Sequence, residues 1–294
     1  MSEYELIIIG GGPAGLAAGI QAGHWSLRTL LIEENTLGGR LLLARKVENF
    51  AAINPKNAAG KRIAQSLIEQ AMRARIDIRN GYCSAIDYRQ GRFLIETADA
   101  FFPGKAVILA TGVRPKRLML PGATVKAVEQ RLFYSWLDLP RPVSGKKVLV
   151  IGGGEVAFDQ ACSLAGQKAL VSVAVRGASP RACPSLVDEA RKSGITISFN
   201  TAVTRLAAND HALIATVLSN GNEMQRSFDY GLIAIGAVPQ QPAITAEARA
   251  MKGAGLFWAG DVVNGDFRQA AIAFGDGIKQ AMRAYEIIRG EKTA

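Results

Sequence analysis

Two stretches of the chain share one pattern of apolar and polar positions: an aliphatic run, a glycine-rich turn, and then a stretch of helical periodicity. They read ELIIIGGGPAGLAAGIQAG from residue 5 and KKVLVIGGGEVAFDQACSLAG from residue 146. Short apolar runs predict buried strands, and the stretches after the turns predict helices. Each stretch continues into another apolar run, RTLLIEE at 28–34 and ALVSVAVR at 169–176. The pattern therefore predicts two strand–helix–strand halves of the Rossmann type.

Two further apolar strands precede proline-marked turns and indicate where the chain crosses between domains. AVILATG occupies 106–112, and YGLIAIGAVPQQP occupies 230–242. The last apolar strand, GLFWAG, leads into a polar loop and a long final helix. We therefore predict an α/β fold of two three-layer, Rossmann-like nucleotide-binding domains. The first is discontinuous, with residues 1–116 and 241–294, and the second, residues 117–240, is inserted into it.

The first glycine turn has the spacing of a dinucleotide-binding site. It follows the strand directly and opens the helix, so that the backbone turns tightly and the helix N-terminus can hold a pyrophosphate. Glu33 ends the next strand, where a carboxylate accepts hydrogen bonds from ribose hydroxyls. A purely structural turn is the alternative, but strand, helix and acid together favour a nucleotide. The candidate contacts of the turn are Gly10, Gly12, Pro13, Ala14 and Gly15.

The second glycine turn carries a variant of this fingerprint, in which Ala157 packs the helix against the strand. After the next strand, Arg176 stands where an acid would favour NADH, and Arg181 follows. An arginine at this place suits a 2′-phosphate, so the sequence favours NADPH over NADH. Solvated loop cations are the alternative interpretation. The candidate contacts of this site are Gly152, Gly154, Glu155, Val156, Arg176 and Arg181.

Composition narrows the class of protein. The 294 residues suffice for two domains, and 49% hydrophobic with 20% charged residues is typical of a globular protein. The net charge of +10 comes without a run of five basic residues or a nucleic-acid motif, so we expect no nucleic acid and favour an acidic partner protein or phosphate-bearing cofactors. The sequence has neither a leader-like start nor about 20 consecutive apolar residues, so we expect a cytoplasmic protein that does not bind membranes.

The reactive residue types are sparse. Cys83, Cys162 and Cys183 are far apart and form no CxxC pair, so each is expected to be a small packing residue. His24 and His211 are the two histidines, and they belong to no metal-ligand pattern. We therefore predict no metal.

Taken in order, the motifs resemble those of the low-molecular-weight thioredoxin reductases over essentially the full length. These motifs are IIIGGGPAGLAA, LGGRL, VENF, ILATG, LPG, IGGGEVA and GDVVNGDFRQA. The resemblance implies FAD in the first domain, NADPH in the second, and a homodimer. It implies that Asp261 holds the ribityl chain and that the positive helix end at 268–270 faces the flavin ring. The implied FAD contacts beyond the first turn are Gly38, Gly39, Arg40, Asn49, Thr111, Gly112, Gly260, Asp261, Arg268, Gln269 and Ala270.

The chain departs from this family in two places. Counted back from Gly152, the family's two redox-active cysteines fall on Ser135 and Asp138, within RLFYSWLDLP. Neither side chain can cycle between dithiol and disulfide, because that chemistry requires a thiolate. In the family's arginine-rich NADPH motif, Val175 and Gly177 replace a histidine and an arginine.

The stretch LFYSWLDLPRPVSGKKVLVIGGG also resembles thioredoxin-reductase-like ferredoxin–NADP reductases, which keep an aromatic and an acidic residue there without the cysteines. This second resemblance implies an FAD-dependent oxidoreductase that passes electrons between NAD(P)H and a carrier such as ferredoxin, rubredoxin or flavodoxin, or a small acceptor. Asp138 is then the candidate catalytic residue, relaying a proton to or from reduced flavin, while Trp136 or Tyr134 shields the ring or contacts a partner. Plain packing is the alternative for all three.

Two other functions stay open at this point. Electrons would enter from reduced ferredoxin if the pyridine-nucleotide site is degenerate, as the replaced arginine motif suggests. Alternatively, the chain is a non-catalytic flavin-binding sensor whose domains respond to the redox state of the flavin.

Overall fold

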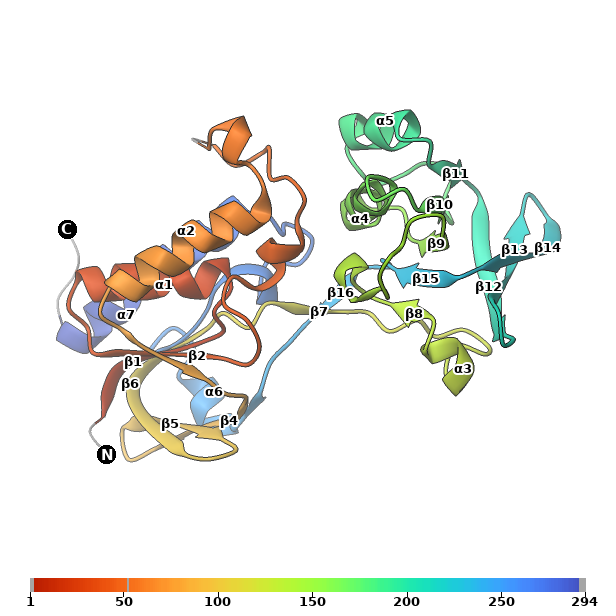
Figure 1. Ribbon diagram of the computed structural model, residues 1–294. Helices are drawn as coiled ribbons and strands as arrows, with labels where there is room; N and C mark the ends of the chain where they lie inside the picture. The colour runs from red at the N-terminus through yellow and green to blue at the C-terminus, as the bar shows by residue number, and fades with distance from the viewer. Residues whose placement is uncertain (1–2, 52, 291–294) are drawn as a thin grey trace. The chain divides into compact units, whose positions relative to one another are not determined.

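The computed structural model describes residues 3–51 and 53–290 and divides the chain into two compact units. The first unit comprises Met1–Arg114 and Val238–Ala294, and the second comprises Pro115–Ala237 (Figure 1). The sequence placed the two crossings at 116/117 and 240/241, within three residues of this division. Both units have the predicted α/β architecture with Rossmann-type parallel strands.

The first unit is built on an eight-stranded sheet of order β17-β4-β5-β6-β1-β2-β3, with β18 also paired to β6. Its long strand β6 joins two kinds of pairing, because its first half is antiparallel to β5 while its second half is parallel to β1 and β18. The strands are β1 (Tyr4–Ile9), β2 (Thr29–Glu33), β3 (Asp77–Asn80), β4 (Cys83–Arg89), β5 (Arg92–Thr97), β6 (Phe101–Leu109), β17 (Ala243–Ile244) and β18 (Leu256–Trp258).

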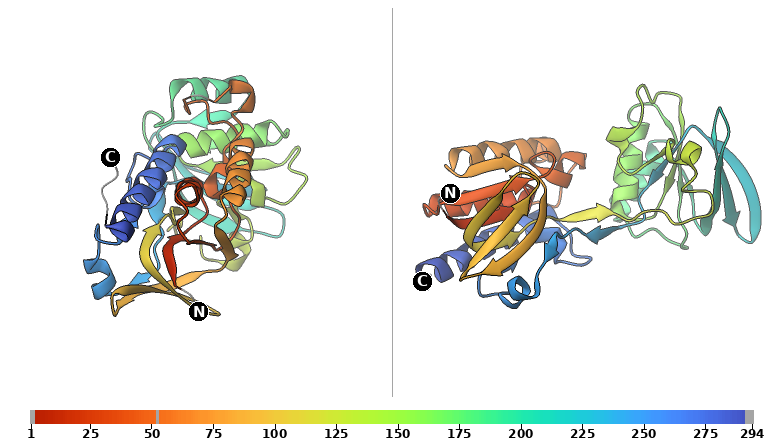
Figure 2. Two further views of the ribbon diagram at one scale, coloured as in Figure 1. Left: turned by 90° about the vertical axis from the view of Figure 1, so that its left-hand side faces the viewer. Right: turned by 90° about the horizontal axis from the view of Figure 1, so that it is seen from below.

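Helices α1, α2 and α7 cover one face of this sheet, as the two views of Figure 2 show, and the short α6 packs on the other. The packing is tightest between α1 and α7, where small side chains on both helices let the backbones approach. Aliphatic side chains of β1, β2 and β6 fill the space beneath these helices, and a second cluster lies on the opposite face. The helical elements are α1 (Pro13–His24), η1 (Gly39–Leu43), η2 (Pro55–Asn57), α2 (Gly60–Arg73), α6 (Ala246–Ala250), η4 (Gly260–Val262) and α7 (Ala270–Arg289).

The two crossings between the units run side by side as a two-stranded sheet of β7 (Val113–Pro115) and β16 (Ala237–Pro239). The Gln240 N–H donates to the Gly112 carbonyl at 3.0 Å, and the Lys116 N–H donates to the Gly236 carbonyl at 3.0 Å. The inserted unit is therefore entered and left at one place.

The second unit combines a five-stranded parallel sheet, β11-β10-β9-β15-β8, with a three-stranded antiparallel sheet, β12-β13-β14. One cluster of buried residues packs the parallel sheet against α4 and α5, and another packs it against the antiparallel sheet. The elements are α3 (Lys126–Glu129), β8 (Leu132–Phe133), η3 (Trp136–Asp138), β9 (Lys147–Ile151), α4 (Glu155–Ala165), β10 (Leu170–Ala174), α5 (Pro184–Lys192), β11 (Thr196–Ser198), β12 (Thr201–Ala208), β13 (Leu213–Ser219), β14 (Asn222–Phe228) and β15 (Tyr230–Ile233). Among the described residues, none of the helices is long and apolar enough to span a membrane.

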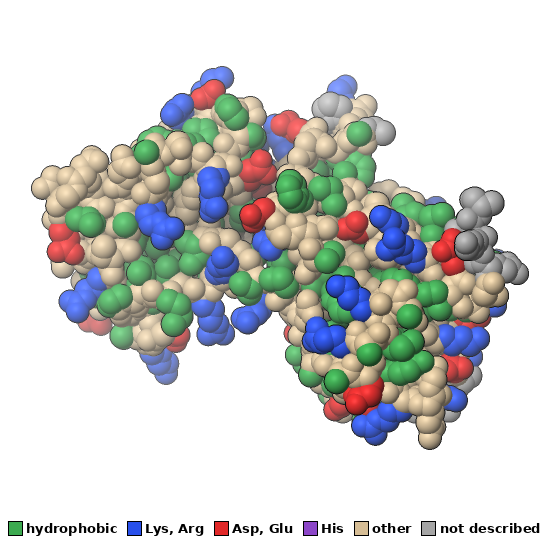
Figure 3. Space-filling view, turned by 180° about the vertical axis from the view of Figure 1, so that it is seen from behind, with side chains coloured by type: hydrophobic (Ala, Val, Ile, Leu, Met, Phe, Trp, Pro, Cys, Tyr) green, Lys and Arg blue, Asp and Glu red, His purple; other side chains and the backbone are tan. Residues whose placement is uncertain are grey.

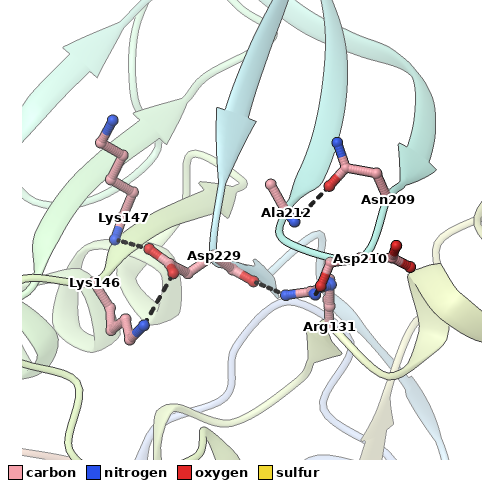
Figure 4. Close-up of polar contacts among 7 residues, drawn as sticks. All are labelled: Arg131, Lys146, Lys147, Asn209, Asp210, Ala212 and Asp229. Atoms are coloured by element: carbon pink, nitrogen blue, oxygen red, sulfur yellow. Dashed lines mark hydrogen bonds and ion pairs between the residues drawn. The ribbon is translucent and has the colours of Figure 1, made fainter.

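Asp229 ties the strands of the second unit together where β14 turns into β15 (Figure 4). Its carboxylate accepts the Lys147 N–H at 2.8 Å and pairs with the Lys146 ammonium at 3.2 Å. Its backbone carbonyl accepts from Arg131, which also donates to the carbonyl of Asp210 at 2.9 Å. Burial acts to raise the pKa of Asp229, but these hydrogen bonds and the lysine charges outweigh burial and lower it.

We expect Asp229→Asn to destabilise the second unit by about 1 kcal/mol at pH 7, because a charge-assisted hydrogen bond is lost at a partly exposed site. Since folding depresses this pKa, the stabilisation is complete above the unfolded value of about 3.9 and is lost as pH falls through the folded value. The gap between wild type and variant in urea unfolding should therefore be constant at neutral pH and narrow as the pH is lowered below about 3.9. A gap that stays constant below that pH would contradict the assignment, and Asp188→Asn, an exposed acid on α5, serves as the control.

Candidate functional site

The turn between β1 and α1 has two glycines that do different things. A Cβ on Gly15 would lie 1.8 Å from the Gly10 carbonyl oxygen, so this position must be glycine for the helix to start where it does. Gly12 is the N-cap of α1, and within the described part of the chain no atom lies within 4 Å of where its Cβ would be. The space at the start of α1 is therefore open, and the free N–H groups of a helix's first turn suit an anion there.

The loop that begins η1 closes over this turn. The Gly38 N–H donates to the Gly11 carbonyl at 2.8 Å, and a Cβ on Gly39 would lie 3.1 Å from the Cα of Gly12. Two predicted contact segments that are far apart in the sequence are thereby brought into backbone contact. Arg40 follows directly in η1 and is half-buried.

Glu33 ends β2 beside the same turn. Its Oε2 accepts the Gly11 N–H at 2.5 Å, and its Oε1 accepts the Asn35 N–H at 2.9 Å. A carboxylate has about four acceptor positions, so each oxygen can still accept from a ribose hydroxyl. Glu33 therefore both fixes the turn and presents the acceptor that the sequence predicted.

Asp261 lies in η4 between two cations, Arg40 and Arg268. Burial raises the pKa of the Asp261 carboxyl, and the two neighbouring guanidinium groups act in the opposite direction. Burial likewise lowers the pKa of Arg40, which the Asp261 charge opposes. Charged side chains that are removed from water are tolerated when opposite charges lie close to them, as here. The cluster adds charged groups beside the open turn.

The N-terminus of α7 meets the loop that carries Asn49. The Asn49 amide donates to Oε1 of Gln269 at 2.7 Å, although the two residues are 220 positions apart. Phe50 and Phe274 pack edge to face with ring centroids 5.1 Å apart. Gln269 is the N-cap of the twenty-residue helix α7, and its side chain does not cap the helix. The positive end of this long helix is therefore held at the same loop.

Asp276 is a residue of this site that the sequence analysis missed. Its Oδ2 accepts the Gly260 N–H at 3.1 Å and the Asn264 amide at 2.6 Å, so it clamps both ends of the turn that carries Asp261. An acid next to the buried face of α7, which is formed by Ala273 and Gly277, is the sequence signal that could have revealed it.

Thr111 and Gly112 lie between β6 and β7, at the crossing. The Thr111 hydroxyl donates to the carbonyl of Gln240, and the Gln240 amide in turn donates to Glu34 at 3.1 Å. Gln240 was also missed, because its partners Glu34, Thr111 and Gly112 are far from it in the sequence.

The second glycine turn repeats the geometry of the first. A Cβ on Gly152 would lie 2.2 Å from the Ala234 carbonyl oxygen, whereas the Cβ position of Gly154 is open within the described residues. Gly154 is the N-cap of α4, and Glu155 and Val156 form the exposed first turn. The N–H groups at this helix start are therefore available to a second pyrophosphate.

Arg176 and Arg181 lie in the loop after β10, and both are exposed. The Arg181 N–H donates to the Gly153 carbonyl at 2.7 Å, so the loop folds back onto the glycine turn. The structure thus brings a predicted phosphate ligand to the turn that would hold the pyrophosphate.

The stretch SWLD forms η3 and is fixed to α4. Ser135 is buried and accepts the Leu137 N–H at 3.2 Å, and the Trp136 N–H donates to Gln160 at 2.8 Å. Arg141 stacks over the Trp136 ring at 5.0 Å. Asp138 is exposed and lies in the second unit, and its role in catalysis stays a prediction.

The first unit has the features that an FAD molecule requires: an open helix N-terminus, a carboxylate beside it, a half-buried Asp–Arg cluster and a second helix N-terminus. The second unit repeats the glycine turn and adds two arginines. The fold and the two turns therefore define a protein with two dinucleotide-binding units.

Comparison with known proteins assigns the family. Residues 4–277 match the pyridine nucleotide-disulphide oxidoreductase family, and the chain belongs to it. It is a thioredoxin reductase-like oxidoreductase of this flavoprotein family, built from Rossmann-type domains.

The chain is similar to relatives with two different names. The thioredoxin reductase of Treponema pallidum is 28% identical, with 98% of each chain covered. Ferredoxin–NADP reductase 3 of Lysinibacillus sphaericus is 33% identical over 213 residues, which cover 70% of this chain and 60% of that protein. Among solved structures, the thioredoxin reductase of T. acidophilum superposes with a TM-score of 0.86 at 25% identity, covering 97% and 99% of the two chains.

Proposed function

We propose that this chain is an FAD-dependent enzyme that transfers electrons between NAD(P)H and a protein electron carrier or small acceptor without a redox-active disulfide. The observation that carries the proposal is the residue pair Ser135 and Asp138, which stands where the resemblance to thioredoxin reductases places the two cysteines. Similarity to a ferredoxin–NADP reductase, as well as to thioredoxin reductases, supports an acceptor other than thioredoxin.

The chain's own cysteines support this reading. All three lie among the described residues, and none is in a disulfide. Burial raises the pKa of Cys83 to about 12, which keeps this thiol protonated and unreactive at neutral pH. Cys162 is buried in α4, and Cys183 is exposed at the start of α5. Their positions in sequence and burial suit packing better than thiol–disulfide exchange.

In the proposed binding mode, the N–H groups of α1 hold the pyrophosphate, Glu33 accepts from the ribose, and Asp261 accepts from the ribityl chain. Bound there, FAD would supply hydride acceptance from reduced nicotinamide and the release of electrons singly or in pairs. The N-terminus of α7 stabilises negative charge at its end, which is the charge that reduction creates. We assign Asp138 the movement of a proton to or from the reduced site, and Arg176 and Arg181 the 2′-phosphate of NADPH.

Anaerobic stopped-flow with the purified flavoprotein tests the proposal. NADPH should bleach the flavin absorbance, and an added carrier or quinone should restore it. If neither NADPH nor NADH bleaches the flavin, the proposed direction fails. Bleaching by reduced ferredoxin alone would select the alternative in which electrons enter from ferredoxin and the pyridine-nucleotide site is degenerate. Val175 and Gly177 favour that alternative, because they replace two polar residues of the family's NADPH motif. If the flavin is bleached but no acceptor reoxidises it in repeated turnovers, the chain is better described as a flavin-binding sensor.

Homodimerisation, which the resemblance implies, and a cytoplasmic location, which the sequence led us to expect, complete the proposal. Sedimentation velocity at micromolar concentration measures the oligomeric state directly, since a dimer has twice the 31.3 kDa mass of the chain.

We expect Asp276→Ala to weaken FAD binding about tenfold, because the turn bearing Asp261 loses the acceptor that clamps both its ends. Asp276→Asn keeps one acceptor and should recover part of the affinity. Titration of the apoprotein, followed by flavin fluorescence, measures the change. Asp266→Ala, an exposed acid on the same loop, is the control and should bind FAD within about twofold of wild type. Equal affinities for the Asp276 variants and wild type would refute the clamp.

A further inference from the structure

The excess positive charge of the chain is spread over its surface, so a docking site requires a local concentration of it. Lys and Arg side chains are scattered among hydrophobic ones on the face of both units seen in Figure 3. Positive charge is concentrated in residues 45–62, because this segment has five basic residues and one acid, Glu48. It lies wholly within the first unit.

The backbone gathers these cations. The Gly60 N–H donates to the Ala44 carbonyl at 3.1 Å, and the Val47 N–H donates to the Ala58 carbonyl at 2.7 Å, so the segment is a closed loop. Arg62 reaches back to the carbonyl of Lys56 at 3.4 Å. Lys46, Lys56, Lys61 and Arg62 are therefore brought together at the base of the loop, and all four are exposed.

Most of this charge is not neutralised within the chain. Lys46 has a partner in Glu48 at 3.5 Å. Among the ion pairs of the residues that the structure describes, none includes Lys56, Lys61 or Arg62. Unpaired exposed cations of this kind raise the local potential and steer an anionic partner.

The tip of the same loop contacts the segment that leads into α7. Asn49 bonds Gln269, and two residues before Gln269 stands Phe267, whose side chain is 78% exposed. Val263, at the other end of this turn, is 54% exposed. An exposed aromatic on the segment that a basic loop contacts has the composition of an interface, with apolar and charged parts. Asp266 is the acid beside it.

We propose that Lys56, Lys61 and Arg62 together with Phe267 form a docking surface for a small acidic one-electron carrier protein. The proposal rests on the proposed function, because Phe267 lies between Asp261 and Gln269, the assigned FAD contacts. A carrier seated on Phe267 would be beside the flavin site, and the basic loop would guide it there. The surface acts on encounter, so its contribution falls as salt screens the charges.

The test uses the holoenzyme, a plant-type [2Fe–2S] ferredoxin of negative net charge, and an uncharged benzoquinone. The double variant Lys56→Glu/Lys61→Glu should lower the rate constant for ferredoxin reduction at least about tenfold at 20 mM salt, and the deficit should shrink at 0.5 M. Quinone reduction should stay within about twofold. The fold should tolerate an acid at position 61, because it stands in the first turn of α2. Lys126→Glu/Lys192→Glu makes the same charge change in the second unit and should reduce ferredoxin nearly as wild type does.

Three outcomes overturn the docking surface. These are ferredoxin reduction by the Lys56/Lys61 variant at the wild-type rate, an equal loss in the Lys126/Lys192 control, and no detectable ferredoxin binding by the wild type. Phe267→Ser should weaken binding while the oligomeric state stays unchanged. If it alters the oligomeric state instead, Phe267 belongs to a contact between copies and the proposal fails. Ferredoxin binding is measured by calorimetric titration without NADPH. If NADPH fails to reduce the flavin, the proposed function is refuted, but the binding test of the docking surface is still valid.

Discussion

Gly12→Ala should leave the protein folded and weaken FAD binding by about a hundredfold or more. The backbone at Gly12 has φ −75° and ψ −173°, which alanine adopts freely, and the added methyl group meets no atom of the described chain. It would occupy the space in front of the α1 N-terminus, where the proposed binding mode places the pyrophosphate and its charge-assisted hydrogen bonds of about 1.5 to 3 kcal/mol each. Thermal unfolding of the apoprotein and FAD titration separate the two effects.

Gly15→Ala is the matched control for that experiment, because the same methyl group would stand 1.8 Å from the Gly10 carbonyl oxygen. This variant should lose about 2 to 3 kcal/mol of stability through backbone displacement, with or without FAD. Should Gly12→Ala bind FAD as wild type does, the pyrophosphate does not lie at α1.

Replacing Arg176 and Arg181 together with alanine should raise KM for NADPH about a hundredfold and leave KM for NADH within about threefold. Each exposed guanidinium would lose a charge-assisted hydrogen bond to the 2′-phosphate, at about 1.5 kcal/mol in this solvated loop. Steady-state kinetics with a quinone acceptor measures both constants, and NADP+ titration confirms that the effect is on binding.

Arg205→Ala removes an exposed arginine of β12 in the same unit and should leave both constants unchanged. A parallel rise of KM for NADPH and NADH in the double variant would show that the loop shapes the whole nucleotide site and that its arginines do not read the 2′-phosphate.

The sequence predicted most accurately what is decided locally. In the GxGxxG turn between β1 and α1, Gly15 must be glycine because it packs against Gly10. These two residues are only five positions apart in the sequence. At the second turn the reason is only partly local, because a Cβ on Gly152 would lie 3.4 Å from the Ala157 Cβ but 2.2 Å from the distant Ala234 carbonyl oxygen. The fold class follows from these repeats, because each half has its apolar strands and its helix in consecutive order.

What escaped prediction depends on contacts between distant segments. Asp276 reads as an ordinary helix residue until α7 is packed and its carboxylate meets the Gly260 N–H. Gln160 accepts the Trp136 N–H from a helix that follows two elements later. Asp229 meets Lys146 and Lys147 only because β15 pairs with β9. Periodicity has no information on such pairs, since it reports burial and not partners.

The insertion of the second unit sets the order in which the protein is completed on the ribosome. Residue 237 ends the second unit, and β18 and α7 emerge only afterwards. Until Leu256–Trp258 arrives, the stretch of β6 from Val107 to Leu109 lacks the strand that covers its outer edge. The nascent chain therefore completes the second unit before the first. During that interval the open β6 edge is the place where a chaperone or a wrong strand would bind.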